Sequence, residues 1–329
     1  MTVHWEVDGR APTPWTRLYV LGMRARRDKQ AFEGEEHTLA KAREAQRQGD
    51  APPTRLTRCV RRVATAGEGG QRHGMTTWTV RPRSTAPRAR VLYVHGGGYV
   101  HPLTPDYWRL VRALSGRSAA AEVVVPAYPL APDATVDDAL PRLLDLAREA
   151  AADDLPLVLM GDSAGGALVL VLARCLRDEG GPQADRVVAL SPWLDPTLDD
   201  DAVRDLEATD PMLAESGLRA AARWWSGRRP PTDPLVDPLR DDLDGLPPIH
   251  LHIGDRDILR PAVDALADRV RGSHGGPGER VDLRVHEVPA MFHVWMTRAI
   301  PEAARTRRRL AAGLGELGGR ARPGRAPGG

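Results

Sequence analysis

The chain has 329 residues, of which 42% are hydrophobic and 27% are charged, a composition typical of a soluble globular protein. Its 46 basic and 44 acidic residues leave a formal charge of only +2. No strong positive field is therefore available to hold a polyanion, and we expect no nucleic-acid partner. No apolar run approaches the roughly 18–20 residues that a membrane-spanning helix needs, so we expect no stable membrane insertion.

The two cysteines, Cys59 and Cys175, lie far apart and in no C-x-x-C pattern. This spacing indicates neither a metal site nor a disulfide framework, and we expect no metal and no cofactor. The N-terminus shows no basic start followed by an apolar stretch and a small-residue cleavage site. A cytoplasmic location is expected by default, and monomer and homodimer are both left open.

From Thr76 onward, short β-branched runs alternate with longer helical patterns. This alternation predicts repeated strand–helix units and a mostly parallel central sheet, which defines an α/β fold. Continuous apolar runs are typical of buried parallel strands, as at 123–125 and 157–160. The seven predicted strands, taken to form one sheet, are Thr76–Val80, Arg90–Val94, Glu122–Pro126, Leu157–Met160, Val187–Leu190, Ile249–Ile253 and Val281–His286.

Five segments between and after these strands carry apolar residues at i, i+3 and i+4, the spacing of amphipathic helices. We expect these helices to flank the sheet. They are Asp106–Arg117, Val136–Ala151, Ala164–Arg177, Pro261–Arg271 and Pro301–Leu314.

Two regions break the alternation. Residues 1–65 are rich in arginine and glutamate, with a helical pattern from Leu18 to Gln48, and residues 195–247 are rich in Asp and Pro, with a helix around Ala214–Trp225. Neither region is expected to contribute to the sheet, so both are candidates for a cap above a catalytic domain made of 66–194 and 248–317. The tail, 318–329, contains only Gly, Ala, Arg and Pro and is expected to be disordered.

Three consecutive glycines follow the strand at 90–94, in His95-Gly96-Gly97-Gly98-Tyr99. Such a run lets the backbone turn its N–H groups toward an approaching oxygen without steric obstruction. In a hydrolase, the N–H groups of Gly97 and Gly98, with that of Ala164, would hold the oxyanion. His95 is expected to brace this loop, and His101 is expected either at the pocket mouth or in solvent.

The strand at 157–160 runs directly into Gly161-Asp162-Ser163-Ala164-Gly165 and then into a helical pattern. A G-x-S-x-G sequence between a strand and a helix predicts a nucleophile elbow, with Ser163 as the nucleophile. The same letters resemble the GDSGG of trypsin-like proteases. Those proteins are all-β and rich in disulfides, so the strand–helix alternation and the few cysteines argue against them.

A serine hydroxyl needs a base to take its proton and a third group to orient that base. His293 follows the last strand, so it falls on the same edge of the sheet as Ser163 and comes after it in the chain, as the order Ser…Asp/Glu…His requires. The acid should follow the strand at 249–253. The residues alone leave Asp255 and Asp257 as the candidates for this role.

These segments together resemble the hormone-sensitive-lipase-like esterases of the α/β-hydrolase superfamily. The resemblance rests on HGGG at 95–98, the Tyr-x-Leu-Ala-Pro segment at 128–132, GDSAGG at 161–166, GDRDIL at 254–259 and FHVW at 292–295. It covers the chain from about Val91 to the last predicted helix. The combination is specific, although each piece alone is only suggestive.

The resemblance implies a catalytic triad of Ser163, Asp257 and His293, with Asp255 as a loop-bracing carboxylate. It also implies a cap of N-terminal helices plus an insertion after the sixth strand. The implied activity is hydrolysis of short- to medium-chain acyl esters, of acetyl type, through an acyl-enzyme, with a small-molecule ester as substrate. After HGGG the family often has a small pair, whereas this chain has Tyr99-Val100, which is closer to bacterial acetyl-hydrolase-type members.

Aromatic residues are the candidates for the walls of the substrate pocket. Besides Tyr99 and His101, these are Trp193, Trp224 and Trp225. The alternative is that the paired tryptophans pack the cap helix onto the core.

Three other functions remain to be compared with an esterase. The same triad could cleave amides, as an amidase or N-deacetylase acting on a biosynthetic intermediate. A non-catalytic ligand receptor, like the plant gibberellin receptor, resembles this family but lacks the catalytic histidine, whereas His293 is present. A membrane-surface lipase could use the basic helix near Arg17–Arg27 as an anchor, although arginines on a solvated cap face explain the same charges more simply.

Overall fold

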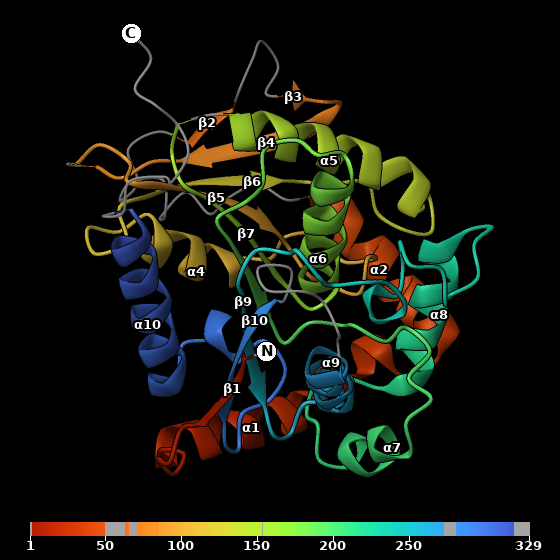
Figure 1. Cartoon of the computed structure of the whole chain (residues 1–329). Helices are drawn as coiled ribbons and strands as arrows, with labels where there is room; N and C mark the ends of the chain where they lie inside the picture. Colours follow the sequence, from red (N-terminus) through yellow and green to blue (C-terminus); the bar gives the residue numbers. More distant parts are fainter. Residues whose placement is uncertain are drawn as a thin grey trace, which may run out of the picture.

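A central β-sheet runs through the molecule in the computed structural model, which describes residues 2–49, 63–65, 71–83, 85–152, 154–272 and 281–318 (Figure 1). The strands are ordered β1-β10-β9-β8-β7-β5-β6-β4-β2, with β3 paired to β4. Along this order, every neighbouring pair from β1 through β10, β9, β8, β7 and β5 to β6 is parallel. The last two pairs are antiparallel, β6 with β4 and β4 with β2. The strands are β1 (Thr2–Val7), β2 (Val63–Thr65), β3 (Gln71–Arg72), β4 (Met75–Val80), β5 (Ala89–Val94), β6 (Ala121–Pro126), β7 (Leu157–Asp162), β8 (Arg186–Leu190), β9 (Ile249–Gly254) and β10 (Asp282–Val288).

All seven predicted strands are present, and the predicted α/β fold with a mostly parallel sheet is confirmed. The central strands β6 and β7 are buried at every position, because helices cover both faces of the sheet there. Toward the edge, β10 alternates between buried and more exposed residues. Continuous apolar runs therefore identified the middle of the sheet correctly.

The expectation that residues 1–65 add no strand is wrong. β1 pairs in parallel with β10 along its whole length, and β2 extends the opposite edge through β4. Val3 and Trp5 of β1 pack against the core, and the Trp5 indole N–H donates to Glu287 at 2.9 Å. The alternation of apolar and polar residues over six positions was the available signal for this strand.

Helices cover the two faces of the sheet. In Figure 1, α4 and α10 lie on one face and α5, α6 and α9 on the other. The five predicted flanking helices are all confirmed, with small shifts at their ends. They are α4 (Tyr107–Leu114), α5 (Val136–Ala152), α6 (Ala164–Asp178), α9 (Arg260–Gly272) and α10 (Pro301–Leu317), with a short helix η3 (Trp295–Thr297) before α10. Within the described ranges, no helix is both long and apolar enough to cross a bilayer.

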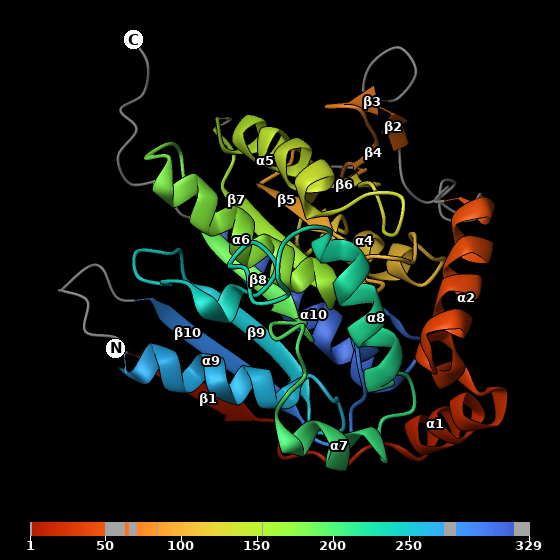
Figure 2. The same cartoon turned by 90° about the vertical axis from the view of Figure 1, so that its right-hand side faces the viewer.

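The segments outside this three-layer frame gather at one end of the sheet, as Figure 2 shows. The single helical pattern expected at 18–48 is broken, because Arg27 (φ 57°) and Gly34 (φ 85°) adopt backbone angles that a helix cannot contain. The predicted helix in the insertion 195–247 is present. The helices here are α1 (Pro14–Arg26), η1 (Asp28–Phe32), α2 (Glu35–Gln48), α7 (Asp201–Glu207) and α8 (Glu215–Ser226). The short helix η2 (Pro238–Arg240) of the insertion packs instead on α6, near the C-terminal end of that helix.

At the far end of the chain, α10 closes at Gly318, whose N–H donates to Leu314 O. The rest of the predicted disordered tail, 319–329, lies outside the described residues, as does Cys59.

The N-terminal segment and the insertion are joined to each other as well as to the sheet. The Gly34 N–H donates to the Ser216 hydroxyl at 3.0 Å, and Arg223 pairs with Glu35 at 2.6 Å. Between these contacts, Gly217 of α8 lies so close to η1 and α2 that an added Cβ would collide with the Phe32 carbonyl and the Thr38 hydroxyl. This close approach needs a glycine.

Replacing Gly217 should therefore destabilise the protein. In an ordinary helix, Gly→Ala adds about 0.5–1 kcal/mol of stability. For Gly217→Ala we expect a loss of about 1–3 kcal/mol instead, because backbone of η1 must move. The measurement is the free energy of unfolding in denaturant. The control is Gly181→Ala, where an added Cβ meets nothing within 4 Å; equal stability of the two variants would contradict the close contact.

Candidate active site

Ser163 stands at the turn between β7 and α6, with φ 51° and ψ −122°. Positive φ is costly for a residue with a side chain, and such strain persists only where the surroundings enforce it. An added Cβ at Gly161 would collide with the Gly165 carbonyl, and one at Gly165 with the Val94 carbonyl. The two glycines of the motif thus let three backbone segments meet under the serine.

The glycine loop lies directly against the serine. A Cβ added to Gly96 would come within 2.8 Å of the Ser163 Cβ. Gly97 and Gly98 both have positive φ, 102° and 61°, and the Gly97 carbonyl accepts the N–H groups of Val100 and His101. Ala164 is the first residue of α6, where backbone N–H groups have no partner within the helix. Gly96 and the first residue of α6 therefore lie next to Ser163, and Gly97 and Gly98 follow Gly96 in the same loop.

Asp162 joins the two loops, a role that the sequence analysis did not assign. Its carboxylate is fully buried and accepts the Gly96 N–H at 3.0 Å and the Tyr93 hydroxyl at 2.6 Å. Burial raises the pKa of Asp162 to about 6. The residue at x in G-x-S-x-G thus fixes the glycine loop relative to the nucleophile.

His95 lies inside the loop, as the sequence analysis expected of a bracing residue. Its ring stacks on that of Tyr128 with centroids 4.5 Å apart, and the Tyr128 hydroxyl donates to the His95 carbonyl at 2.9 Å. Burial lowers the pKa of His95 to about 4, so its ring is neutral at ordinary pH.

His293 and Asp257 meet at the same edge of the sheet. The His293 Nδ1 lies 2.9 Å from Asp257 Oδ2, and the two residues are 4% and 0% exposed. Burial alone would lower the pKa of His293, but the charge and hydrogen bond of Asp257, with weaker effects of Asp210 and Asp162, raise it above its usual value.

Asp255 takes a different place from Asp257. Its carboxylate accepts the Ala290 N–H at 2.6 Å, at the start of the loop that carries His293. At the other end of this loop, the Val294 N–H donates to the Ser191 hydroxyl at 3.1 Å. The loop is therefore held on both sides of the histidine, and the structure places Asp257 rather than Asp255 against the ring.

A second buried carboxylate, Asp210, lies beside this pair and was missed by the sequence analysis. One of its oxygens accepts the N–H groups of Met212 and Leu213, and the other accepts the Ile258 N–H at 3.1 Å. Burial, and then the charge of Asp257, raise the pKa of Asp210 to about 6. An Asp in an irregular stretch just before a helix was the available signal, but it indicates a turn as readily as a site.

Three of the five predicted pocket residues form one aromatic stack. The Tyr99 ring lies parallel to that of Trp225 at 4.4 Å and near that of Trp193 at 5.4 Å, and all three side chains are at most 1% exposed. The backbone N–H of Trp193 donates to the Ser163 carbonyl at 2.9 Å. The stack therefore joins α8 to the elbow and the glycine loop, whereas Trp224 packs at the margin of the core.

His101 is the last of the five predicted pocket residues, and its ring is not free in solvent. Its ring meets that of Phe32 edge-on at 5.3 Å, and burial lowers its pKa to about 4. Its Nε2 is buried and has no hydrogen-bond partner among the described residues. Phe32 also lies 2.8 Å from where a Gly98 Cβ would be, so the N-terminal segment covers the glycine loop.

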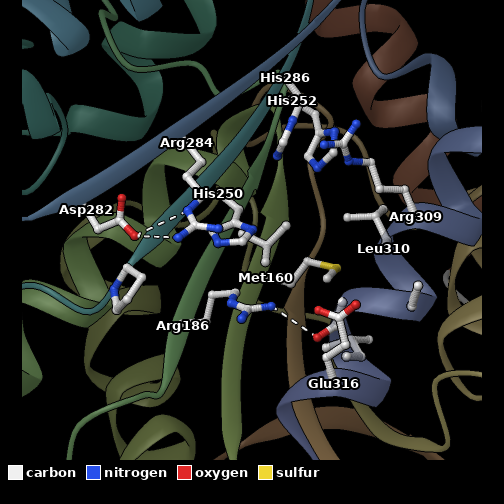
Figure 3. A pocket seen from close by; sticks show the side chains of 15 residues that line it. Met160, Arg186, His250, His252, Asp282, Arg284, His286, Arg309, Leu310 and Glu316 are labelled. Atoms are coloured by element: carbon white, nitrogen blue, oxygen red, sulfur yellow. Dashed lines mark hydrogen bonds and ion pairs between the residues drawn. The ribbon is translucent and has the colours of Figure 1, made fainter. Parts of the chain in front are cut away.

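A polar cleft of about 450 Å³ lies between α10 and the strands β8 to β10, away from the residues above. His250, His252 and His286 point into it opposite Arg309, as Figure 3 shows. Burial and neighbouring arginines lower the pKa of His250 to about 3 and that of His286 to about 4, and the pKa of His252 falls well below its usual value. Among the described residues, no group of His, Cys, Asp and Glu is arranged to hold a metal ion.

Comparisons with known proteins agree with this geometry. A family model described as an alpha/beta hydrolase fold matches residues 91–297. The chain is 31% identical over 227 residues to an acetyl-hydrolase of Streptomyces hygroscopicus, a match that covers 68% of this chain and 73% of that protein. It is 32% identical over 235 residues to the carboxylesterase/phospholipase LipF of Mycobacterium tuberculosis, over 67% of this chain and 60% of that protein. The chain thus spans less than two thirds of this second relative.

Among solved structures, an esterase from the bacterial hormone-sensitive lipase family is similar, with a TM-score of 0.77. The similarity covers 94% of this chain and 99% of that one, at 24% identity. At this identity, the likeness establishes the shared fold.

The histidines of the polar cleft should make the protein sensitive to acid. Their pKa values are lower in the folded than in the unfolded chain, so the unfolded chain binds more protons and stability falls as the pH drops from about 6.5 toward 4. We expect His286→Gln to reduce the loss of unfolding free energy between pH 7.5 and 4.5 by on the order of 1 kcal/mol. The control is His37→Gln, since His37 is exposed on α2; the same pH dependence in both variants would refute this origin of the acid sensitivity.

Proposed function

The chain belongs to the hormone-sensitive-lipase-like family of α/β hydrolases, a family of serine ester hydrolases. From this premise we propose that it is a carboxylesterase that acts on short acyl esters, and on acetyl esters above all. The observation that carries the proposal is the buried hydrogen bond of 2.9 Å between His293 and Asp257, at the edge of the sheet where Ser163 stands in its strained turn.

In the proposed mechanism, Asp257 engages Nδ1 of His293, which leaves Nε2 to take the proton of the Ser163 hydroxyl. The serine oxygen attacks the ester carbonyl, and the N–H groups of Gly97, Gly98 and Ala164 stabilise the oxyanion. His293 then donates the proton to the leaving alcohol, which gives the acyl-enzyme. Water releases the acid by the same steps in reverse.

The positive charge that His293 acquires during the reaction has two buried carboxylates nearby besides Asp257. Asp210 and Asp162 both contribute to raising the pKa of His293. A histidine with a raised pKa is a stronger base, and its charged form is stabilised in the transition state. The rate should fall as the pH drops through this raised pKa, because the base must be neutral to accept the proton.

The aromatic stack supports a short acyl group. Tyr99 follows directly after the proposed oxyanion donors, and its ring is fixed between Trp193 and Trp225 with almost no exposed surface. Phe32 and His101 cover the other side of the loop. Bulky rings that are already in contact leave little room for a long acyl chain beside the glycines. The Streptomyces relative, an acetyl-hydrolase, agrees with this preference.

The roles of the two candidate acids can be separated with a matched pair of variants. Asp257→Asn should lower kcat by about 10³–10⁴, because His293 loses its negative partner, and the acid limb of the residual activity should move to lower pH as the pKa of His293 falls. Asp255→Asn should cost less than about tenfold, since an amide oxygen can still accept the Ala290 N–H. Steady-state kinetics across pH measure both; equal losses in the two variants would contradict the assignment of Asp257.

Substrate preference can be measured with p-nitrophenyl esters from acetate to palmitate, together with an aryl acetamide. We expect kcat/KM to be highest for acetate to butyrate and to fall by about tenfold or more at longer chains, with the amide cleaved far more slowly. Ser163→Ala should abolish turnover and labelling by a fluorophosphonate probe. Lack of labelling of the wild-type protein would favour a non-catalytic binding protein, and faster cleavage of the amide would favour an amidase.

A further inference from the structure

Helix α1 has two apolar faces, although a surface helix needs only one. Its inner face buries Thr16, Val20 and Met23. On the other side, Trp15, Leu18 and Leu21 are 58%, 59% and 60% exposed. At about 100° per residue, these three side chains fall within a sector of about 120°, so they form one stripe along the outside of the helix, which we call the outer stripe.

The outer stripe is unusual for this protein. In the described part of the chain, the only other large hydrophobic residue with comparable exposure is Val7, at 52%. Single exposed apolar residues are normal on a protein surface, whereas a contiguous group marks a contact with another molecule or a membrane. Three adjacent large side chains on one helix therefore indicate an interaction surface.

Basic residues border the stripe on both sides. At helical spacing, Arg17 and Arg24 lie along one border and Arg26, which is paired with Asp28 at 3.0 Å, lies along the other. Helix α1 contains no acidic residue. Two copies of α1 facing each other would bring these arginines together with no carboxylate of the helix to pair with them, which disfavours a second copy of this chain as the occupant. An apolar stripe with a Trp between arginines fits the boundary of an anionic lipid layer.

The inner face of α1 touches the proposed active site. The ring of Tyr19 stacks on Phe292, next to His293, with centroids 6.1 Å apart. From the border of the outer stripe, Arg24 donates to the carbonyl of Thr209 at 3.2 Å, next to Asp210. Because a helix is only about 10 Å across, a surface that rests on the outer stripe lies close to the catalytic base.

We propose that α1 is a docking helix that seats the protein peripherally on anionic lipid surfaces, so that the enzyme meets its esters there. The substrate part of this inference rests on the proposed esterase function. The preferred substrate is then a short acyl ester of an apolar alcohol dissolved in the lipid layer. No helix is inserted across the bilayer, since only the stripe enters the headgroup boundary.

The test is flotation with vesicles of 30% phosphatidylglycerol in phosphatidylcholine and with vesicles of pure phosphatidylcholine. The wild-type protein should float with the anionic vesicles, and less so at 0.5 M NaCl. The triple variant Trp15→Ser/Leu18→Ser/Leu21→Ser should bind them at least about tenfold more weakly, and Arg17→Glu should also weaken binding. Val7→Ser, which removes exposed apolar surface that is not part of the stripe, should leave binding unchanged.

Hydrolysis of dissolved p-nitrophenyl acetate separates this inference from the proposed function. The triple variant should keep the wild-type kcat/KM on the dissolved ester, which also shows that it is folded, and lose activity only on an ester carried in the vesicles. Wild-type protein that hydrolyses the dissolved ester but does not float overturns the inference alone, as does a triple variant that floats like the wild type. Sedimentation that shows a wild-type dimer and a monomeric triple variant would make the stripe a self-interface and equally overturn it.

Discussion

The site depends on one steric constraint, namely how closely backbone segments approach one another beneath Ser163. Gly161, Gly165 and Gly96 have no space for a Cβ, because carbonyl groups, the Asp162 carboxylate or the serine itself occupy it. This close packing forces the serine to positive φ and brings the start of α6 and the glycine loop to the same point. Any side chain at these glycines would separate the nucleophile from the N–H groups that are proposed to serve it.

The same packing surrounds three buried carboxylates near His293. Asp162, Asp210 and Asp257 are all buried near His293, and each helps to raise its pKa. Burying three carboxylates near one another is unfavourable unless each is hydrogen-bonded, and each accepts at least one backbone N–H. Those bonds also fix the loops at Gly96, Met212 and Leu259, so the residues that supply negative charge to the site also hold its walls together.

The fold and the proposed triad could be predicted because both rest on local signals. Continuous apolar runs identified the strands, and G-x-S-x-G has a specific meaning between a strand and a helix. The choice of Asp257 over Asp255 came from resemblance, since both follow the same strand. The contribution of β1 to the sheet could not be derived by pattern alone, because its pairing with β10 joins segments about 280 residues apart in the chain. Asp210 was missed for the same reason: its acceptance of the Ile258 N–H is visible only in three dimensions.

The N-terminal segment is held against the proposed active site by direct contacts. Phe32 rests on Gly98, and the side-chain amide of Gln46 donates to the carbonyls of Val100 and Ala131 at 2.8 and 2.9 Å. The N-terminal segment therefore cannot shift without disturbing the loop that carries the proposed oxyanion donors. Since α1 belongs to that same segment, a surface that binds its outer stripe is coupled through η1 and α2 to the glycine loop. The contacts that make this link are those of the Phe32 ring and the Gln46 amide, not of the exposed stripe, so loss of the stripe leaves the glycine loop in place.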